Sequence, residues 1–205
     1  MKNKLTKISC TLALLASVAA TPAFSQNNFA GLSGSIGIGY DRAKDTVSDV
    51  GGTESLKENN WVPVLDLSYG INASKDFVFA LGGTYSLADS KMDGPDYKGK
   101  LKDHYSIYLE PTYLLNDKTG VFLNLSYNNA KDTAKADSDG ITFSKDVSGY
   151  GYGVGIKNFI DKNLFVKAQV NYVKYDSENT TSSDDVATTI SPKTTTALIS
   201  VGYKF

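Results

Sequence analysis

The residue with the clearest capacity for acid–base chemistry is His104, the single histidine of the chain, which stands two positions before Ser106. On an extended strand, residues two apart share a face, so this histidine could activate the serine as a nucleophile. Glu110, the acid of matching parity, lies about 20 Å further along such a strand and is too distant to orient the imidazole. A polar strand end is the competing interpretation, and we expect the chain not to be an enzyme.

A larger set of polar side chains falls on the polar face of several alternating segments. The set comprises Asp66, His104, Tyr108, Glu110, Asn124, Lys157, Lys167 and Lys204. An unpaired buried charge is costly, so opposite charges enclosed together would pair and hydrogen-bond. We therefore predict an interior polar network, in which Lys204 could reach either Asp66 or Glu110.

Metal and cofactor sites are not predicted. The stretch "DSDG", residues 137–140, has two acids of a calcium loop but lacks its third ligand position and its distal glutamate. An Asp-Gly turn explains it better. Clustered acids such as Asp184 and Asp185 would bind divalent cations only weakly.

The elements that must position these residues are eight segments with strict apolar–polar alternation. They cover residues 32–41, 61–71, 77–87, 104–113, 121–128, 149–157, 164–172 and 197–205. Alternation of this period indicates half-buried β-strands. A length of about ten residues is what a tilted strand needs to cross a bilayer.

The connections between these segments alternate in length. Short turns contain "NASKD", "NDKTG" and "IDKN", whereas long polar connections cover residues 42–60, 88–103, 129–147 and 174–194. A soluble sandwich has no reason to sort its loops in this way. We predict an all-β fold: an eight-stranded, antiparallel, up-and-down transmembrane β-barrel with short periplasmic turns and long extracellular loops.

The apolar face supports a barrel that is apolar outside and polar inside. Its middle is aliphatic, and aromatic residues stand toward the long connections: Tyr40, Trp61, Tyr85, Tyr105, Tyr127 and Tyr172. Such rings suit a membrane interface. Two strand prolines, Pro63 and Pro111, remove ladder donors and are predicted to mark bulges or rim positions.

The N-terminus predicts export. Lys2, Lys4 and Lys7 precede an apolar run that is too short to span a membrane and that ends in small residues, which is typical of a signal peptide. We expect residues 1–25 to be removed and residues 26–205 to form the barrel. Loss of three lysines changes the net charge of the 205-residue chain from −1 to −4. This balance excludes a basic nucleic-acid binder.

The chain resembles the small eight-stranded outer-membrane barrels of the OmpX, Ail and OmpA type. The likeness lies in "EPTYLLND" at residues 110–117, in "YGYGVGI" at residues 150–156, and in the ending "VGYKF". The last segment, with Ala197, Ile199, Val201, Tyr203 and Phe205 on one face, is similar to the sorting signal that the barrel assembly machinery recognises. The resemblance implies an outer-membrane protein of Gram-negative type, with roles that range from membrane structure to adhesion.

Three functions remain open from the sequence. The first is a structural or surface-interaction barrel whose loops contact host, phage or lipopolysaccharide and whose lumen is filled by polar side chains. The second is a narrow porin-like channel for small solutes. The third is a lipid-modifying enzyme, because "HYS" at residues 104–106 is similar to the His-x-Ser element of lipid A deacylase barrels. We expect a monomer that contacts outer-membrane lipids, with no cofactor.

Overall fold

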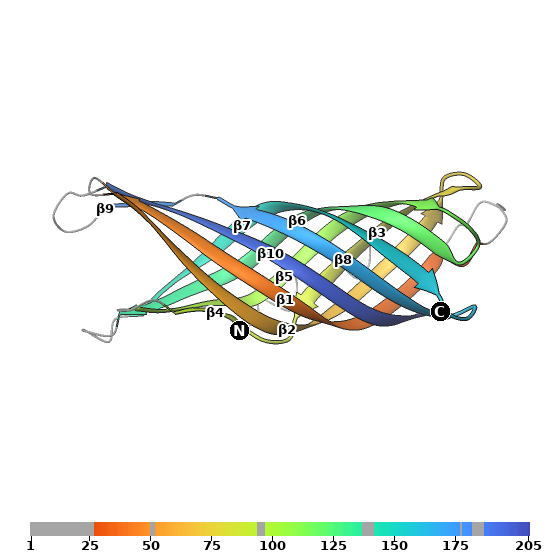
Figure 1. Cartoon of the computed structure of the whole chain (residues 1–205), viewed down its shortest axis with the longest axis horizontal. Coiled ribbons are helices and arrows are strands. Elements are labelled where there is room, and N and C mark those ends of the chain that lie inside the picture. The colour runs from red at the N-terminus through yellow and green to blue at the C-terminus, as the bar shows by residue number, and fades with distance from the viewer. Residues whose placement is uncertain (1–26, 50–51, 94–96, 137–141, 177, 182–186) are drawn as a thin grey trace, which may run out of the picture.

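Antiparallel β-strands make up nearly all of the described chain (Figure 1). The computed structural model describes residues 27–49, 52–93, 97–136, 142–176, 178–181 and 187–205. The strands are β1 (Gly31–Asp49), β2 (Gly52–Asn72), β3 (Phe77–Ser86), β4 (Ser90–Asp93), β5 (Tyr97–Leu114), β6 (Thr119–Ala136), β7 (Thr142–Phe159), β8 (Leu164–Tyr175), β9 (Glu178–Thr181) and β10 (Ala187–Lys204). Within these ranges no helix is long and apolar enough to cross a membrane. The predicted signal peptide lies outside the described residues.

The ten segments form eight barrel strands. The short segment β4 pairs with β5 beyond the end of β3, and β9 pairs with β10 beyond the end of β8. The neighbours follow the order β1-β2-β3-β5-β6-β7-β8-β10, and β10 returns to β1. This is the order of hairpins joined in sequence, and it confirms the predicted up-and-down barrel.

The closing pair is the one expected from the alternation of the last segment. Ser33 lies opposite Lys204, and Tyr40 lies opposite Ala197, in an antiparallel ladder that continues to the far end of β1. Closure is required in lipid because each unpaired backbone group of an open edge would cost several kcal/mol. Hydrogen bonding around the whole ring therefore stabilises the fold.

The two faces of each strand differ as predicted. On β10, Ile199 and Val201 are 65% and 49% exposed, whereas their neighbours Leu198 and Ser200 are 5% and 4% exposed. Successive side chains of a strand point to opposite faces, so the exposed apolar set faces lipid and the buried set fills the interior. The barrel therefore has its aliphatic surface outside.

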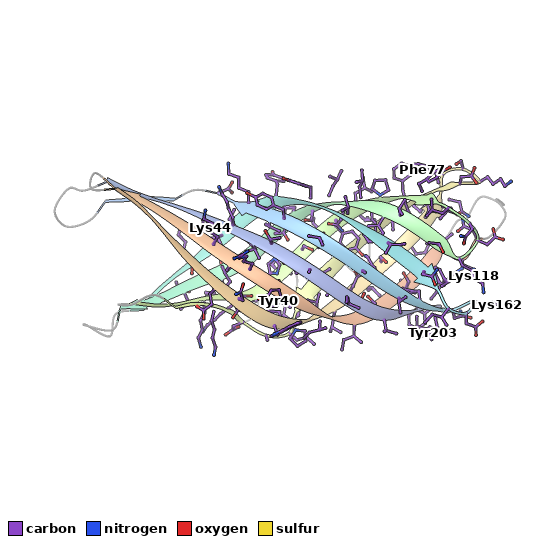
Figure 2. The ribbon with its side chains drawn as sticks, in the orientation of Figure 1. Tyr40, Lys44, Phe77, Lys118, Lys162 and Tyr203 are labelled. Carbon is purple, nitrogen blue, oxygen red and sulfur yellow. The ribbon has the colours of Figure 1, made fainter. Side chains whose placement is uncertain are left out.

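Aromatic side chains lie at both ends of this aliphatic belt. Toward the long connections, Tyr40 packs on Trp61 with ring centroids 4.9 Å apart. We call the aromatic set at this end the outer girdle: Tyr40, Trp61, Tyr85, Tyr105, Tyr127, Tyr150, Tyr152 and Tyr172. Phe77 and Tyr203 lie toward the short turns (Figure 2). The belt between the two aromatic ends is the part that crosses the membrane.

The predicted long loops are in large part strand, which corrects the sequence assignment. The β1–β2 ladder continues past Tyr40 until Asp49 lies opposite Gly52, and the β6–β7 ladder continues until Lys135 lies opposite Thr142. The sequence of these extensions is rich in charged and hydroxyl residues and shows little apolar–polar alternation. Their pairing follows from the register that the barrel sets below them.

Of the two predicted explanations for Pro63 and Pro111, bulges or rim positions, the bulge is wrong for both residues. The register is the same on both sides of each proline. The Pro63 carbonyl accepts the Leu87 N–H at 2.8 Å, just beyond the end of β3. The N–H that Pro63 lacks would therefore point to where the β2–β3 ladder has ended. The shift in register lies instead between Lys102 and Tyr105, where Asp103 adopts a φ of 51°.

Candidate functional site: the barrel lumen

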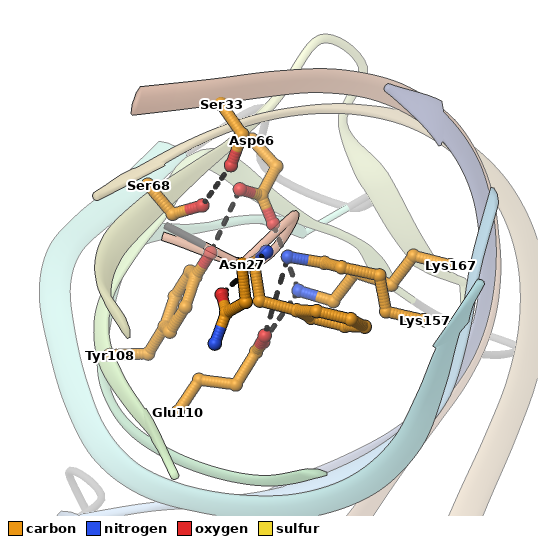
Figure 3. Close-up of polar contacts among 9 residues, drawn as sticks. Asn27, Ser33, Asp66, Ser68, Tyr108, Glu110, Lys157 and Lys167 are labelled. Carbon is orange, nitrogen blue, oxygen red and sulfur yellow. Dashed lines mark hydrogen bonds and ion pairs between the residues drawn. The ribbon is translucent and has the colours of Figure 1, made fainter. Parts of the chain in front are cut away.

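Four charged side chains meet in the lumen. The Lys167 ammonium on β8 donates to Glu110 Oε2 on β5 at 2.6 Å and to Asp66 Oδ2 on β2 at 3.4 Å. The Lys157 Nζ on β7 lies 3.8 Å from Glu110 Oε1. These bonds cross from one wall of the barrel to the other (Figure 3). We call Asp66, Glu110, Lys157 and Lys167 the charged tetrad.

The tetrad offsets the repulsion between two neighbouring lysines. Lys157 and Lys167 lie directly opposite each other on neighbouring strands, an arrangement that is destabilising by itself. The two carboxylates offset their charge from β2 and β5. All four side chains are almost completely buried, and Glu110 is 1% exposed. Removing one member would therefore leave an uncompensated charge inside the barrel.

Aromatic rings hold the tetrad in place. The Tyr108 hydroxyl donates to Asp66 Oδ1 at 2.8 Å. Lys167 Nζ lies over the rings of Tyr108 and Phe122, at 5.2 and 4.8 Å from their centroids. A Cβ at Gly82 would stand 2.5 Å from the Tyr108 hydroxyl, so the small residue makes room for this ring. Each lysine thus has both an anion and an aromatic face beside it.

An apolar layer lies between the tetrad and the short turns. It consists of Phe29, Val78, Leu114, Phe159 and Phe165. Phe29 precedes β1 and packs edge-on against Phe159, with centroids 5.0 Å apart. The segment that carries it is tied down, because Lys204 Nζ donates to the Asn27 carbonyl at 3.2 Å. Residues 27–30 therefore enter the end of the barrel that bears the short turns.

Sequence reasoning missed this role of Phe29. The segment before the first alternating strand was assigned no structure. The only signal is an apolar side chain that follows three polar residues, Gln26, Asn27 and Asn28, immediately before the first strand. Such a pattern does not distinguish an inserted ring from an exposed one.

The other end of the lumen has a polar layer and then a second apolar layer. Ser86 Oγ bonds His104 Nδ1 at 3.2 Å, and Thr84 Oγ1 bonds Ser106 Oγ at 2.7 Å. Beyond them lie the buried residues Ala43, Leu101, Ala130, Val147, Val173 and Tyr175. Leu101 and His104 both face inward because the irregularity at Asp103 adds one residue between them.

A cavity of about 60 Å³ lies within the polar layer. Three buried atoms at its wall make no hydrogen bond within the described chain: His104 Nε2, Gln169 Oε1 and Asn171 Oδ1. Buried polar groups of this kind are normally satisfied by water, and the volume suffices for a few molecules. We therefore expect these three atoms to bond water inside the cavity.

His104, Ser106 and Glu110 do not form a catalytic triad with one another. Ser106 bonds Thr84 and His104 bonds Ser86, so neither bonds the other. Glu110 is held by Lys167 in the tetrad. All three side chains belong to the inward set, whereas a lipid substrate lies outside the wall. Among the described residues, no group of three or more His, Cys, Asp or Glu side chains could hold a metal ion.

The predicted interior residues thus fall into separate groups. Asp66, Tyr108, Glu110, Lys157 and Lys167 are in contact, and Asn124 is buried at the cavity beside them. His104 lies in the polar layer, and Lys204 bonds Asn27 at the short-turn end. The predicted assembly residues lie on the lipid side of the last strand: Ala197, Ile199, Val201, Tyr203 and Phe205. The Phe205 N–H donates to the Leu32 carbonyl. The acids at 137–140 and 184–185 lie outside the described residues.

Several solved outer-membrane proteins share this fold. Ail of Yersinia pestis, in complex with the heparin analogue sucrose octasulfate, is 22% identical with a TM-score of 0.51, over 85% of this chain and 99% of Ail. OprG of Pseudomonas aeruginosa is 14% identical with a TM-score of 0.51, over 88% and 99%. The Escherichia coli outer membrane protease OmpT is 10% identical with a TM-score of 0.51, over 89% and 99%.

These likenesses concern the fold, since a protease and an attachment protein share it. Comparison with curated protein sequences gives no significant match. The model of the outer membrane protein beta-barrel domain matches residues 11–205, which is nearly the whole sequence. This match agrees with the closed barrel and its lipid-facing belt. The chain belongs to the outer membrane protein beta-barrel family and is located in the outer membrane.

Proposed function

We propose that this barrel has a structural and surface-interaction role and does not conduct solutes. The observation that carries the proposal is the charged tetrad, which spans the bore from β2 and β5 to β7 and β8. An eight-stranded barrel is just wide enough for side chains to fill it. The apolar layers on both sides of the tetrad add to the barrier, because a hydrated ion would have to leave its water to pass them.

The extended hairpins support the surface role. The paired strands β1–β2 and β6–β7 rise beyond the outer girdle as ordered ladders, in place of irregular loops. A ladder of this kind holds polar side chains at fixed spacing outside the membrane, which suits contact with host, phage or lipopolysaccharide. Ail, the attachment invasion locus protein, was crystallised with a heparin analogue, so a barrel of this fold can bind a ligand.

The first test is conductance. The purified barrel, checked for folding by its heat-modifiable migration on unboiled gels, is incorporated into planar lipid bilayers. We expect no reproducible opening. Steady unitary currents would contradict the proposal and favour the alternative, a narrow channel for small solutes.

The second test addresses the surface role directly. Lys131 lies opposite Asp146 on the β6–β7 ladder, so joining these residues through a two-residue turn removes the outer part of this hairpin and keeps the membrane-spanning belt. Cells that display the intact chain should bind heparin-coated beads or cultured epithelial cells, and the shortened variant should bind less. Equal binding by both variants, at equal surface levels, would argue against a role for this hairpin.

A further inference from the structure

A buried carboxylate lies at the outer end of the lumen without a basic partner. Asp41 on β1 is 8% exposed, and its Oδ2 accepts a hydrogen bond from Ser90 Oγ at 3.0 Å. Within the part of the chain that the structure describes, none of the ion pairs involves Asp41. A hydroxyl donor satisfies a lone pair but carries no net charge. The negative charge of Asp41 is therefore not offset, and a buried charge of this kind is costly.

The basic side chains near this height of the barrel, and those of the charged tetrad, do not supply the missing positive charge. Arg42 follows Asp41 along β1 and is exposed on the opposite face of the strand. The tetrad lies at another height, because Ser35, which is opposite Asp66, comes six residues before Asp41, or about 20 Å along the strand. Both lysines of the tetrad are also paired with Glu110.

The wall of the neighbouring cavity offers oxygen atoms. Asp41 lines the cavity of about 60 Å³ in the polar layer, together with hydroxyl and amide side chains from several strands. Gln169 on this wall is 6% exposed, and its Oε1 makes no hydrogen bond within the described chain. The Asn171 Oδ1, two residues along β8, is a second acceptor of this kind. Carboxylate, carbonyl and water oxygens are the ligands that hard cations take.

The register of the outer lumen places the carboxylate and the amides on neighbouring strands. Asp41 lies opposite Thr196 on β10, and Thr196 lies opposite Asn171 on β8. All three residues line the cavity. Because adjacent strands are about 4.8 Å apart, the backbones of Asp41 and Asn171 are separated by about 10 Å. An ion in the cavity, together with the water that we expect there, can link these side chains.

We propose that the cavity binds one monovalent cation, such as Na⁺, on the Asp41 carboxylate, and that cavity water and the amide oxygens of Gln169 and Asn171 complete its shell. Water satisfies hydrogen bonds, but only a cation offsets the charge. One positive charge is sufficient, because Asp41 is the one acidic side chain among the described residues that line the cavity. The site goes beyond the proposed surface role, since it lies inside the lumen and ties β1 to β8 below the extended hairpins.

Urea unfolding of the purified barrel in detergent micelles tests this site. Sodium chloride is exchanged for choline chloride at constant ionic strength, because choline is too large for the cavity. The pH is 8, where an ordinary imidazole is neutral. A ligand that binds only the folded state stabilises it by about 1.4 kcal/mol for each tenfold increase in concentration above its Kd. With a urea slope of about 2 kcal/mol per M, the midpoint should rise by roughly 0.7 M per tenfold increase in sodium.

The Asp41→Asn variant removes the charge and keeps an acceptor for Ser90. It should lose the dependence on sodium, and in choline it should be at least as stable as the unaltered chain, because no charge is left unpaired. The matched control is Asp89→Asn, the same change at an exposed acid next to Ser90, and it should keep the dependence on sodium.

Three results would overturn the proposal. The first is an equal midpoint in sodium and in choline for the unaltered chain, a comparison that requires no variant to fold. The second is an unchanged dependence on sodium in Asp41→Asn. The third is a midpoint that rises in choline between pH 8 and pH 6 and does not respond to sodium at either pH, which would show that protonated His104 offsets the charge.

Discussion

Replacing Glu110 by glutamine is the sharpest perturbation of the lumen, because it changes charge and leaves the size of the side chain almost the same. The Glu110 carboxylate is the partner of both lysines in the tetrad, at 2.6 Å from Lys167 and 3.8 Å from Lys157. After Glu110→Gln, two ammonium groups on adjacent strands would share the single carboxylate of Asp66. Breaking a buried ion pair by removing one partner costs about 3–5 kcal/mol.

Urea unfolding in detergent micelles measures this cost. The single tryptophan, Trp61, is 66% exposed on the lipid face, so its fluorescence reports the transfer from micelle to water. With a urea slope of about 2 kcal/mol per M, the variant should unfold at a urea concentration lower by roughly 2 M. Heat-modifiable migration on gels shows in parallel whether the variant folds at all.

A double variant separates charge from packing. Lys167→Met alone removes the ammonium and leaves Glu110 with Lys157, so it should also destabilise the barrel. Glu110→Gln combined with Lys167→Met restores a balance between Lys157 and Asp66, and it should lose less than the sum of the single changes. Additive losses, or a loss below about 1 kcal/mol for Glu110→Gln, would refute the reasoning that the tetrad acts as one neutral unit.

Three further changes test the remaining parts of the wall. Phe29→Ala should lower the free energy of unfolding by about 3 kcal/mol in the same urea assay, because it empties a ring site in the apolar layer; an unchanged midpoint would show that residues 27–30 do not pack there. Gly82→Val should cost about 1–3 kcal/mol, since a Cβ would meet the Tyr108 ring and the Leu67 carbonyl, and native stability would contradict the contact. Deleting Phe205 should reduce the heat-modifiable fraction in isolated outer membranes while periplasmic export continues; normal insertion would remove its role as an assembly signal.

Much of the fold follows from residue order alone. The alternation in residues 197–205 predicted which side chains of β10 face lipid, and the exposures of Ile199 and Ser200 agree. The alternation along one strand is enough to predict this, because a strand has only two faces and only one of them contacts lipid. The extended hairpins were not predictable in this way, because they lie beyond the lipid and their sequence shows little apolar–polar alternation.

The candidate site required the tertiary structure. Parity placed Asp66, Glu110 and Lys167 inside the barrel, but their contacts depend on the stagger of strands that are distant in sequence. The hydrogen bond between Lys167 and Asp66 joins residues 101 positions apart. The position of Leu101 beside His104 likewise depends on the backbone at Asp103, which no periodicity indicates.

The sequence by itself therefore determined the number of strands, their closure, and the side of the wall on which each side chain of the belt lies. Only the tertiary structure decided which charges meet in the lumen and how Phe29 enters it. The physical reason is that the side of the wall to which a side chain points depends on its own strand alone, whereas contact across a barrel depends on the register of all its strands together.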